Sequence, residues 1–206
     1  MKGGSTMYNI FKNRGFSIHN EQKYDTKEIA KYRRMLLENV NGEILEIGTG
    51  IGLNLPYYPS DVRHLTGIDE QIKKIDSKHI EVDYYYGKTN PLPFAANSFD
   101  TIVATFALSR MMELSPTIEE IKRVLRSRGR FLLLDHGRTD NKNEYIVQDI
   151  ITPFSEIIGG RVYNRDYFEI LENHGFLLAH AQKSRIHMLP KMCKGTLYSC
   201  VAVNIK

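Results

Sequence analysis

Three glycines within five residues, placed directly after a short apolar run, are the feature that most constrains the fold of this chain. The stretch EILEIGTGIG covers residues 43–52, and its glycines are Gly48, Gly50 and Gly52. EILEI has the character of a strand, and glycines after a strand let the backbone turn tightly. Ligands of open α/β sheets bind at the carboxyl ends of the strands, where bare peptide groups allow close approach. The stretch therefore predicts a first strand followed by a ligand-binding turn.

Strand and helix signals alternate along the rest of the chain. Further strands are expected at 62–69, 79–87, 99–107, 130–137, 176–186 and 196–206. Helices are expected at 25–42, opened by a capping box from Asp25, at 115–129 with Ser115 as N-cap, at 143–160 and at 165–175. This alternation predicts an α/β fold with a doubly wound, mainly parallel sheet.

Composition excludes several classes of protein. The 206 residues, 42% of them hydrophobic, suit one domain of ordinary size. No apolar run reaches the roughly 18 residues of a membrane span, and no signal peptide opens the chain, so we expect a cytoplasmic protein without a transmembrane segment. The two cysteines, Cys193 and Cys200, lack metal-ligand spacing, and we expect no metal. The net charge of +4 comes from scattered basic residues, so nucleic acid is not indicated as a partner.

The residues around the glycines favour a cationic nucleoside ligand without phosphates. A nicotinamide fingerprint, G-x-G-x-x-G, would need a third glycine at Leu53, so NAD is not expected. Glu46 places a negative charge where a pyrophosphate would lie. Asp69 ends the second strand 21 residues after Gly48, close to the ~20 expected for a carboxylate that binds ribose hydroxyls.

Taken together, these motifs resemble class I S-adenosylmethionine-dependent methyltransferases. ILEIGTGIG resembles motif I of that family, and TGID resembles its ribose-binding strand end. GKTNPLPFAANSFDTIVATFAL resembles the block before and through strand four, and EEIKRVLRSRGRFLLLDHG follows at the usual distance. In pattern, GLNLPYYP and DHG are most similar to the methyltransferase-like group of thiol and phospholipid methyltransferases. The chain is also similar to the ubiquinone/menaquinone C-methyltransferases.

This resemblance implies a Rossmann-like doubly wound sheet of seven strands in the order 3-2-1-4-5-7-6. The last strand is expected to be antiparallel, because the segment HMLPKMCKG before it is too short for a crossover helix but adequate for a hairpin. We expect a single methyltransferase domain over 1–206, with an N-terminal arm or lid at 1–26 and a core at 27–206. Within that core, 141–162 is expected to contribute to a cap over the substrate.

The resemblance also implies which residues bind S-adenosylmethionine. They are Glu46, Gly48, Thr49, Gly50, Gly52, Asp69, Glu70, Gln71, Gly87, Lys88, Thr89, Thr105 and Phe106. Many relatives carry an acid where this chain has Lys88, so the backbone amide is expected to serve there. Asp135 and His136, at the end of strand five, are the candidate catalytic residues, because a histidine near neutrality suits proton transfer. Adjacent strand residues face opposite ways, so only one of them is expected to enter the pocket.

The predicted reaction is methyl transfer from S-adenosylmethionine to a small-molecule or lipid-like acceptor. A nucleic-acid methyltransferase is an alternative, but ATFA occupies the strand end where enzymes that methylate base amino groups carry Asn-Pro-Pro-Tyr or Asp-Pro-Pro-Tyr. A module that binds the cofactor without turnover is a second alternative. Release of S-adenosylhomocysteine would separate an enzyme from such a module.

Overall fold

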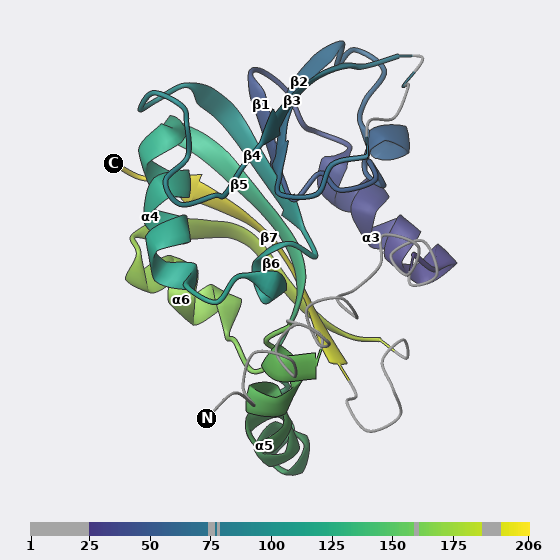
Figure 1. Ribbon diagram of the computed structural model, residues 1–206, viewed down its shortest axis with the longest axis vertical. Helices are drawn as coiled ribbons and strands as arrows, with labels where there is room; N and C mark the ends of the chain where they lie inside the picture. The colour runs from purple at the N-terminus through teal and green to yellow at the C-terminus, as the bar shows by residue number, and fades with distance from the viewer. Residues whose placement is uncertain (1–24, 74–76, 78, 159–160, 187–194) are drawn as a thin grey trace, which may run out of the picture.

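A seven-stranded sheet in the order β3-β2-β1-β4-β5-β7-β6 forms the centre of the computed structural model (Figure 1). The structure describes residues 25–73, 77, 79–158, 161–186 and 195–206. Strands β1 to β5 pair in parallel, whereas β7 pairs antiparallel with both β5 and β6. The predicted fold class, strand order and antiparallel last strand are therefore confirmed. The expected arm at 1–26 lies outside the described residues except for its last two positions.

The elements follow one another as the alternating pattern predicts. The strands are β1 (Ile44–Ile47), β2 (His64–Asp69), β3 (Glu81–Tyr86), β4 (Phe99–Thr105), β5 (Leu125–Gly137), β6 (Phe176–Ile186) and β7 (Gly195–Asn204). The helices are α3 (Lys27–Leu37), α4 (Leu114–Val124), α5 (Lys142–Ile158) and α6 (Tyr167–Asn173), with 3-10 turns η1 (Leu55–Tyr57) and η2 (Leu108–Arg110). Among the residues that the structure describes, no helix is both long and apolar enough to cross a bilayer.

Each face of the sheet has its own hydrophobic core. Leu132 and Leu134 of β5 pack in one cluster with Ile29 and Leu37 of α3. Leu133, between them in sequence, belongs to the other cluster, which includes buried residues of α4 and α6. Figure 1 shows α4 and α6 together, on the other side of the sheet from α3. The period-two alternation of a strand thus places helices on both faces, as a doubly wound sheet requires.

The first predicted helix begins and ends differently from the expectation. Thr26, and not Asp25, is the N-cap of α3, and its Oγ1 accepts a hydrogen bond from the Ile29 amide at 3.4 Å. Asp25 instead accepts a hydrogen bond from Arg33 Nε at 3.0 Å. The helix ends at Leu37, five residues before the expected end at residue 42. A partly buried ion pair with Arg33 therefore engages the side chain of Asp25 that the capping box would have used.

The helix expected at 115–129 is cut short by the sheet. It begins at Leu114, with Glu113 and not Ser115 as its N-cap, and it ends at Val124. Leu125 already pairs with Phe99 at the start of β5, so the strand begins five residues before the predicted position 130. Long-range pairing to β4 overrides the helical pattern of this segment, which local propensity alone favours.

The glycine turn after β1 packs closely against neighbouring strands. Gly48, Gly50 and Gly52 have φ values of +75°, +51° and +69°, a region that favours glycine. A Cβ added to Gly48 would clash with the Cβ of Ala107, just beyond β4. Gly67 of β2 makes room in the same way for the side chain of Thr49. Gly48 and Gly67 are therefore needed for packing within the protein.

Replacing Gly48 by alanine should destabilise the chain even without ligand. The new methyl group meets the side chain of Ala107 and the backbone stays in the left-handed region, so we expect a loss of ~1–3 kcal/mol in the free energy of unfolding. Gly87→Ala is the matched control, because no atom lies within 4 Å of a Cβ built there. Urea unfolding of both variants measures the difference, and equal stabilities would contradict this account of the turn.

Candidate functional site

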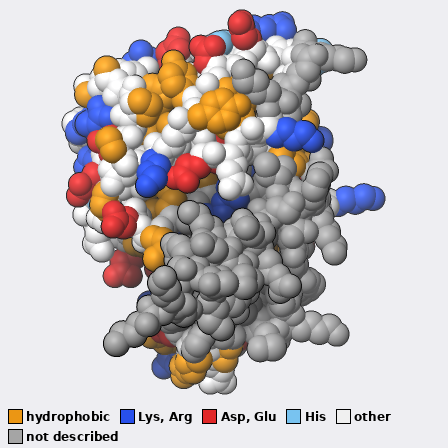
Figure 2. Space-filling model, in the orientation of Figure 1, with side chains coloured by type: hydrophobic (Ala, Val, Ile, Leu, Met, Phe, Trp, Pro, Cys, Tyr) orange, Lys and Arg blue, Asp and Glu red, His pale blue; other side chains and the backbone are white. Residues whose placement is uncertain are grey.

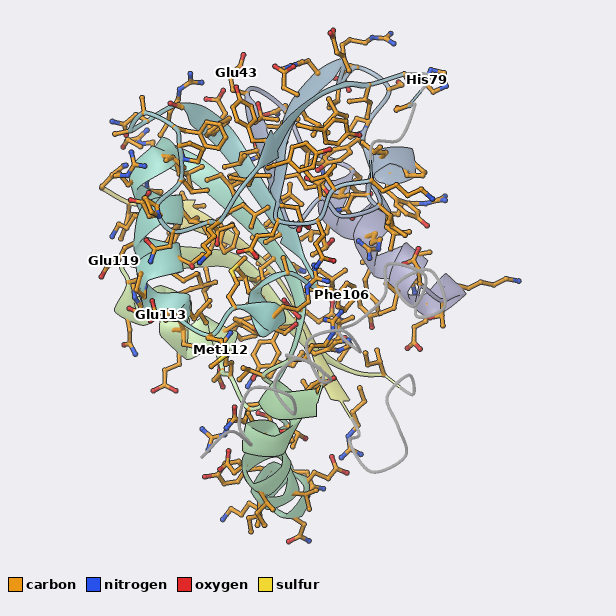
Figure 3. The ribbon with its side chains drawn as sticks, in the orientation of Figure 1. Glu43, His79, Phe106, Met112, Glu113 and Glu119 are labelled. Atoms are coloured by element: carbon orange, nitrogen blue, oxygen red, sulfur yellow. The ribbon has the colours of Figure 1, made fainter. Side chains whose placement is uncertain are left out.

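The carboxyl ends of β1, β2, β4 and β5 bring the main predicted site residues to one edge of the sheet. The glycine turn follows β1, Asp69 ends β2, Phe106 follows β4, and His136 lies at the end of β5. Figure 3 shows Phe106 at this edge. The parallel register of these four strands gathers the side chains, as the position of ligand sites in open sheets predicts.

Asp69 is tied directly to the glycine turn. One carboxylate oxygen, Oδ2, accepts a hydrogen bond from the Gly50 amide at 3.0 Å, and Oδ1 accepts one from the Gln71 amide at 2.9 Å. The guanidinium of Arg110 lies 3.8 Å from Oδ2. The structure thus brings Asp69 and the glycines together, although 19 residues separate Asp69 from Gly50 in the sequence.

A buried polar network backs the glycine turn on the face that carries α3. Glu46 accepts hydrogen bonds from Asn54 Nδ2 at 3.1 Å and from the Tyr58 hydroxyl at 2.8 Å. Arg33 Nη1 donates to Asn54 Oδ1 at 2.5 Å and to Thr105 Oγ1 at 2.7 Å. All five side chains are buried. Four separate segments, α3, β1, the η1 region and β4, therefore meet through one connected set of hydrogen bonds.

Arg33, Asn54 and Tyr58 are the members of this network that sequence reasoning missed. The segment NLPYYP after the glycines carries two of them, and the resemblance had already marked it as part of the family pattern. Arg33 lies in an amphipathic helix among other basic residues, Arg34 and Lys31, which are exposed. No local sequence feature distinguishes Arg33 from its exposed neighbours. Its burial is decided by how α3 packs against the sheet.

Burial controls the ionisation of Glu46. Loss of solvent raises the pKa of its carboxyl from the ordinary 4.5 to about 7, against the opposing hydrogen bonds from Tyr58 and Asn54 and the charge of Arg33. The nearby charge of Asp69 raises it further. The glutamate that precedes the glycine turn is therefore poised to exchange a proton near neutral pH.

Phe106 holds a strained backbone at the end of β4. Its φ is +54°, a conformation that a bulky residue rarely adopts. The backbone is fixed there because its amide donates to the Leu134 carbonyl at 2.7 Å and its carbonyl accepts from Arg161 Nη1 at 3.3 Å. Its ring lies 4.8 Å from the ring of His136 and 5.2 Å from the guanidinium carbon of Arg33. This backbone thus places an aromatic ring against the side chains of Arg33 and His136.

Asp135 and His136 are both buried but face different surroundings. Asp135 Oδ2 accepts a hydrogen bond from the Ser109 amide at 2.9 Å, and Oδ1 accepts one from the His136 amide at 2.7 Å. Burial raises the pKa of Asp135, although Arg161 and these hydrogen bonds lower it. The ring of His136 lies instead between Phe106 and Tyr163, whose ring centroid is 6.3 Å away.

The imidazole of His136 is neutral and incompletely hydrogen-bonded. Burial, with the positive charge of Arg161 adding to it, lowers the pKa of His136 from 6.5 to about 3. Its Nδ1 is buried and has no hydrogen-bond partner in the part of the chain that the structure describes. Buried polar atoms are nearly always paired in native proteins, so the unpaired Nδ1 is available to a water molecule or to a ligand atom.

The remaining predicted cofactor residues divide into two groups. The Oγ1 atoms of Thr49 and Thr105 are engaged within the protein, the first donating to the Glu46 carbonyl at 3.1 Å and the second accepting from Asn54 at 3.0 Å. The others directly follow the ends of β2 and β3, where the Gly87 amide donates to the Asp69 carbonyl at 3.1 Å. This second group comprises Glu70, Gln71, Gly87, Lys88 and Thr89.

Comparison with known proteins agrees with this geometry. A family model described as a methyltransferase domain matches residues 45–133. The chain is 31% identical over 139 residues to a phosphatidylethanolamine N-methyltransferase of Cereibacter sphaeroides, covering 62% of this chain and 68% of that protein. It is 26% identical to a thiol S-methyltransferase of Homo sapiens, over 77% of this chain and 70% of that protein.

One further relative and one solved structure are also similar to this chain. A ubiquinone/menaquinone biosynthesis C-methyltransferase of Geotalea daltonii is 28% identical, over 50% of this chain and 51% of that protein. A solved structure of an S-adenosylmethionine-dependent methyltransferase from Methanosarcina mazei has a TM-score of 0.63 at 17% identity, covering 87% of this chain and 98% of that one. The resemblance predicted from the motifs is confirmed.

The raised pKa of Glu46 makes stability depend on pH. The folded chain keeps a proton that the unfolded chain releases above pH 4.5, so this contribution to stability is full below pH 4.5 and is lost as the pH rises through about 7. Between about pH 5 and about pH 8, we expect the wild type to lose on the order of 2 kcal/mol relative to Glu46→Gln, which cannot ionise.

Guanidinium unfolding at the two pH values measures this difference. Glu43→Gln is the matched control, because Glu43 precedes the same strand and is exposed. The control should follow the pH dependence of the wild type. An unchanged pH dependence in Glu46→Gln would show that the buried carboxyl does not titrate in this range.

Proposed function

Because the chain belongs to the family of S-adenosylmethionine-dependent methyltransferases, we propose that it methylates a small-molecule or lipid-like acceptor bound where β4 and β5 end. The observation that carries this proposal is the buried, neutral imidazole of His136, with its unpaired Nδ1 set between Phe106 and Tyr163. The relatives are named for phosphatidylethanolamine, thiol and quinone-precursor methylation, which supports an acceptor of low molecular mass or a lipid.

The residues at the sheet edge fit the cofactor of this family. S-adenosylmethionine supplies a methyl group on a positively charged sulfonium. The glycines of the turn place no side chain in the way of a ligand, and the Asp69 carboxylate beside them offers oxygen atoms for ribose hydroxyls. When it is ionised, the buried carboxyl of Glu46 places negative potential beneath the same turn. We propose that Glu70, Gln71, Gly87, Lys88 and Thr89 border the adenosine, as the family pattern implies.

The acceptor side needs orientation and exclusion of water more than it needs strong acid or base. Methyl transfer to an aligned nucleophile gains much of its rate from a near-attack geometry. We propose that the rings of Phe106 and Tyr163 exclude water there and that α5 contributes to the cap. The unpaired Nδ1 of His136 accepts a hydrogen bond from the acceptor molecule, so that a lone pair of the acceptor atom faces the methyl donor.

Asp135 acts in this proposal as a positioning residue. Its two carboxylate oxygens already accept hydrogen bonds from the amides of Ser109 and His136. Through them it fixes the η2 turn against the end of β5, and so fixes the backbone of His136. General-base catalysis by His136 stays a prediction, since an imidazole of such low pKa is a weak proton acceptor before the acceptor binds.

The proposed function is tested by release of S-adenosylhomocysteine with a panel of thiols, amines, phenols and phospholipids. We expect turnover with at least one class.

Asp69→Ala should weaken cofactor binding by ~10–100-fold in calorimetry, because ribose hydroxyls would lose their partner in a buried site. Asp83→Ala is the matched control, since that carboxylate contacts the exposed His64, at the opposite end of β2 from Asp69. Cofactor binding without release of S-adenosylhomocysteine in the presence of any of these acceptors would refute the proposal.

The role of His136 is tested by His136→Ala. Loss of one hydrogen bond to the acceptor should lower kcat/KM by ~10–100-fold, with cofactor affinity unchanged. A neutral ring does not titrate between about pH 6 and about pH 9, so the loss should be the same across that range. His180→Ala, at an exposed position on β6, is the control.

A larger loss of ~10²–10⁴-fold, partly recovered at high pH, would instead assign His136 as the general base. Thermal unfolding of the same variants shows whether the change acts through the fold. Equal loss of stability and activity would remove His136 from both roles.

A further inference from the structure

A positively charged side chain reaches the carboxylate that is proposed to bind the ribose. The guanidinium Nη2 of Arg110 lies 3.8 Å from Oδ2 of Asp69. Arg110 belongs to the η2 turn after β4, whereas Asp69 ends β2, and β1 lies between these two strands in the sheet. A Cβ built on Gly48 would meet Ala107 and approach Asp69 Oδ2 to 4.0 Å, so the glycine turn lies in the same gap. The side chain of Arg110 therefore links the ends of β4 and β2 beside the glycine turn.

The hydrogen-bonding capacity of Asp69 is already half used within the protein. A carboxylate accepts about four hydrogen bonds, two on each oxygen. The Gly50 amide takes one position on Oδ2, and the Gln71 amide takes one on Oδ1. A ribose that donates one hydroxyl to each oxygen needs both remaining positions. Because Arg110 faces Oδ2, it competes with the ribose for one of them.

The contact between Arg110 and Asp69 is weak enough for a ligand to displace it. Its length of 3.8 Å exceeds that of a hydrogen bond, so it is an ion pair held by charge alone. The side chain of Arg110 is 30% exposed, and ion pairs with such access to solvent contribute little. The η2 backbone is held more firmly, because the Ser109 amide donates to Asp135 at 2.9 Å. A ligand therefore has to move the side chain of Arg110 and not the turn.

Arg110 also offsets the negative charge of Asp69. The methyl donor S-adenosylmethionine carries a positive sulfonium, whereas the sulfur of the product S-adenosylhomocysteine is neutral. Because the sulfonium is joined to the ribose through a single carbon beyond the ring, binding of the ribose at Asp69 brings that charge close to the ion pair. A carboxylate beside a guanidinium attracts the sulfonium less than an unpaired carboxylate would.

The other charges near these strand ends leave this effect in place. Glu46 has a pKa of about 7, so it is partly protonated near neutral pH, and the positive charge of Arg33 acts on it. The side chains of Glu70, Lys73 and Lys88 are exposed, and water and salt screen them. Figure 2 shows acidic and basic side chains mixed over the described part of one face, with no large area of a single sign there. The near neighbours of Asp69 therefore set the charge that a ligand meets.

We propose that Arg110 limits the affinity of the site by competing with the cofactor for Asp69, and that it weakens binding of S-adenosylmethionine more than binding of S-adenosylhomocysteine. This inference rests on the proposed function, in which Asp69 binds the ribose of that cofactor. Arg110 is then a specificity-determining residue for donor against product. It makes the protein more sensitive to inhibition by its own product than the rest of the site requires.

Calorimetry with S-adenosylmethionine and S-adenosylhomocysteine, at low salt, tests the proposal. Arg110→Gln should bind the product ~2–5-fold more tightly, the gain expected from removing a partly exposed ion pair. It should bind the donor more tightly by a further factor of about two or more, because Asp69 regains its full charge. Rising salt should reduce both differences from the wild type. Arg110→Lys keeps the charge and should stay close to the wild type.

Arg126→Gln is the matched control. It removes the ion pair of Arg126 with Asp100, which is 2.5 Å long and lies near the start of β4, at the opposite end of the strand from η2. Both affinities should be unchanged in this variant. Unchanged or weaker binding by Arg110→Gln, equal tightening toward donor and product, or the same change in the Arg126 control would each overturn the proposal. Thermal unfolding shows that the compared variants are folded.

The same measurements separate this inference from the proposed function. Binding that changes as expected, without turnover on any acceptor, would overturn the proposed function alone. Turnover by a protein whose affinities do not tighten in Arg110→Gln would overturn the role of Arg110 alone. Absence of binding of either ligand by the wild type would overturn both.

Discussion

The buried carboxyl of Glu46 is the group on which the organisation of the site depends. A charge placed in the interior is costly unless hydrogen bonds and an opposite charge accompany it. Asn54, Tyr58 and Arg33 supply these, and they come from elements that are distant in the sequence. The requirement to satisfy one acid therefore holds α3 and the η1 region against β1, directly beneath the glycine turn. The pKa of Glu46 remains raised because these partners offset the effect of burial only in part.

The same network extends toward the end of β5 through Thr105 and Phe106. Arg33 donates to Thr105, and its guanidinium lies over the ring of Phe106, which in turn contacts His136. The left-handed backbone of Phe106 is unfavourable in isolation and is maintained by its hydrogen bonds to β5 and to Arg161. The glycine turn and the end of β5 are consequently parts of one connected arrangement, so a change in α3 can reach the end of β5.

Burial also decides which chemistry the acceptor side can perform. Histidine is usually chosen for proton transfer because its pKa lies near neutrality, and this was the basis for predicting a base at position 136. In the folded chain, desolvation and Arg161 keep the ring neutral. A neutral ring with an unpaired nitrogen is suited to binding and orienting an acceptor, which is the main requirement of a reaction with an activated methyl donor.

The sequence by itself determined the doubly wound sheet, the glycine turn and the place of Asp69, because each depends on local pattern and on short spacings that strand geometry converts into position. The strand order followed from the resemblance of the motifs to a known family. Only the tertiary structure decided that Leu125 starts a strand and that Arg33 is buried whereas Arg34 is exposed. It alone decided the ionisation of Glu46 and His136. The physical reason is that solvent exclusion and pairing between distant segments set these properties, and neither is a property of any short stretch of chain.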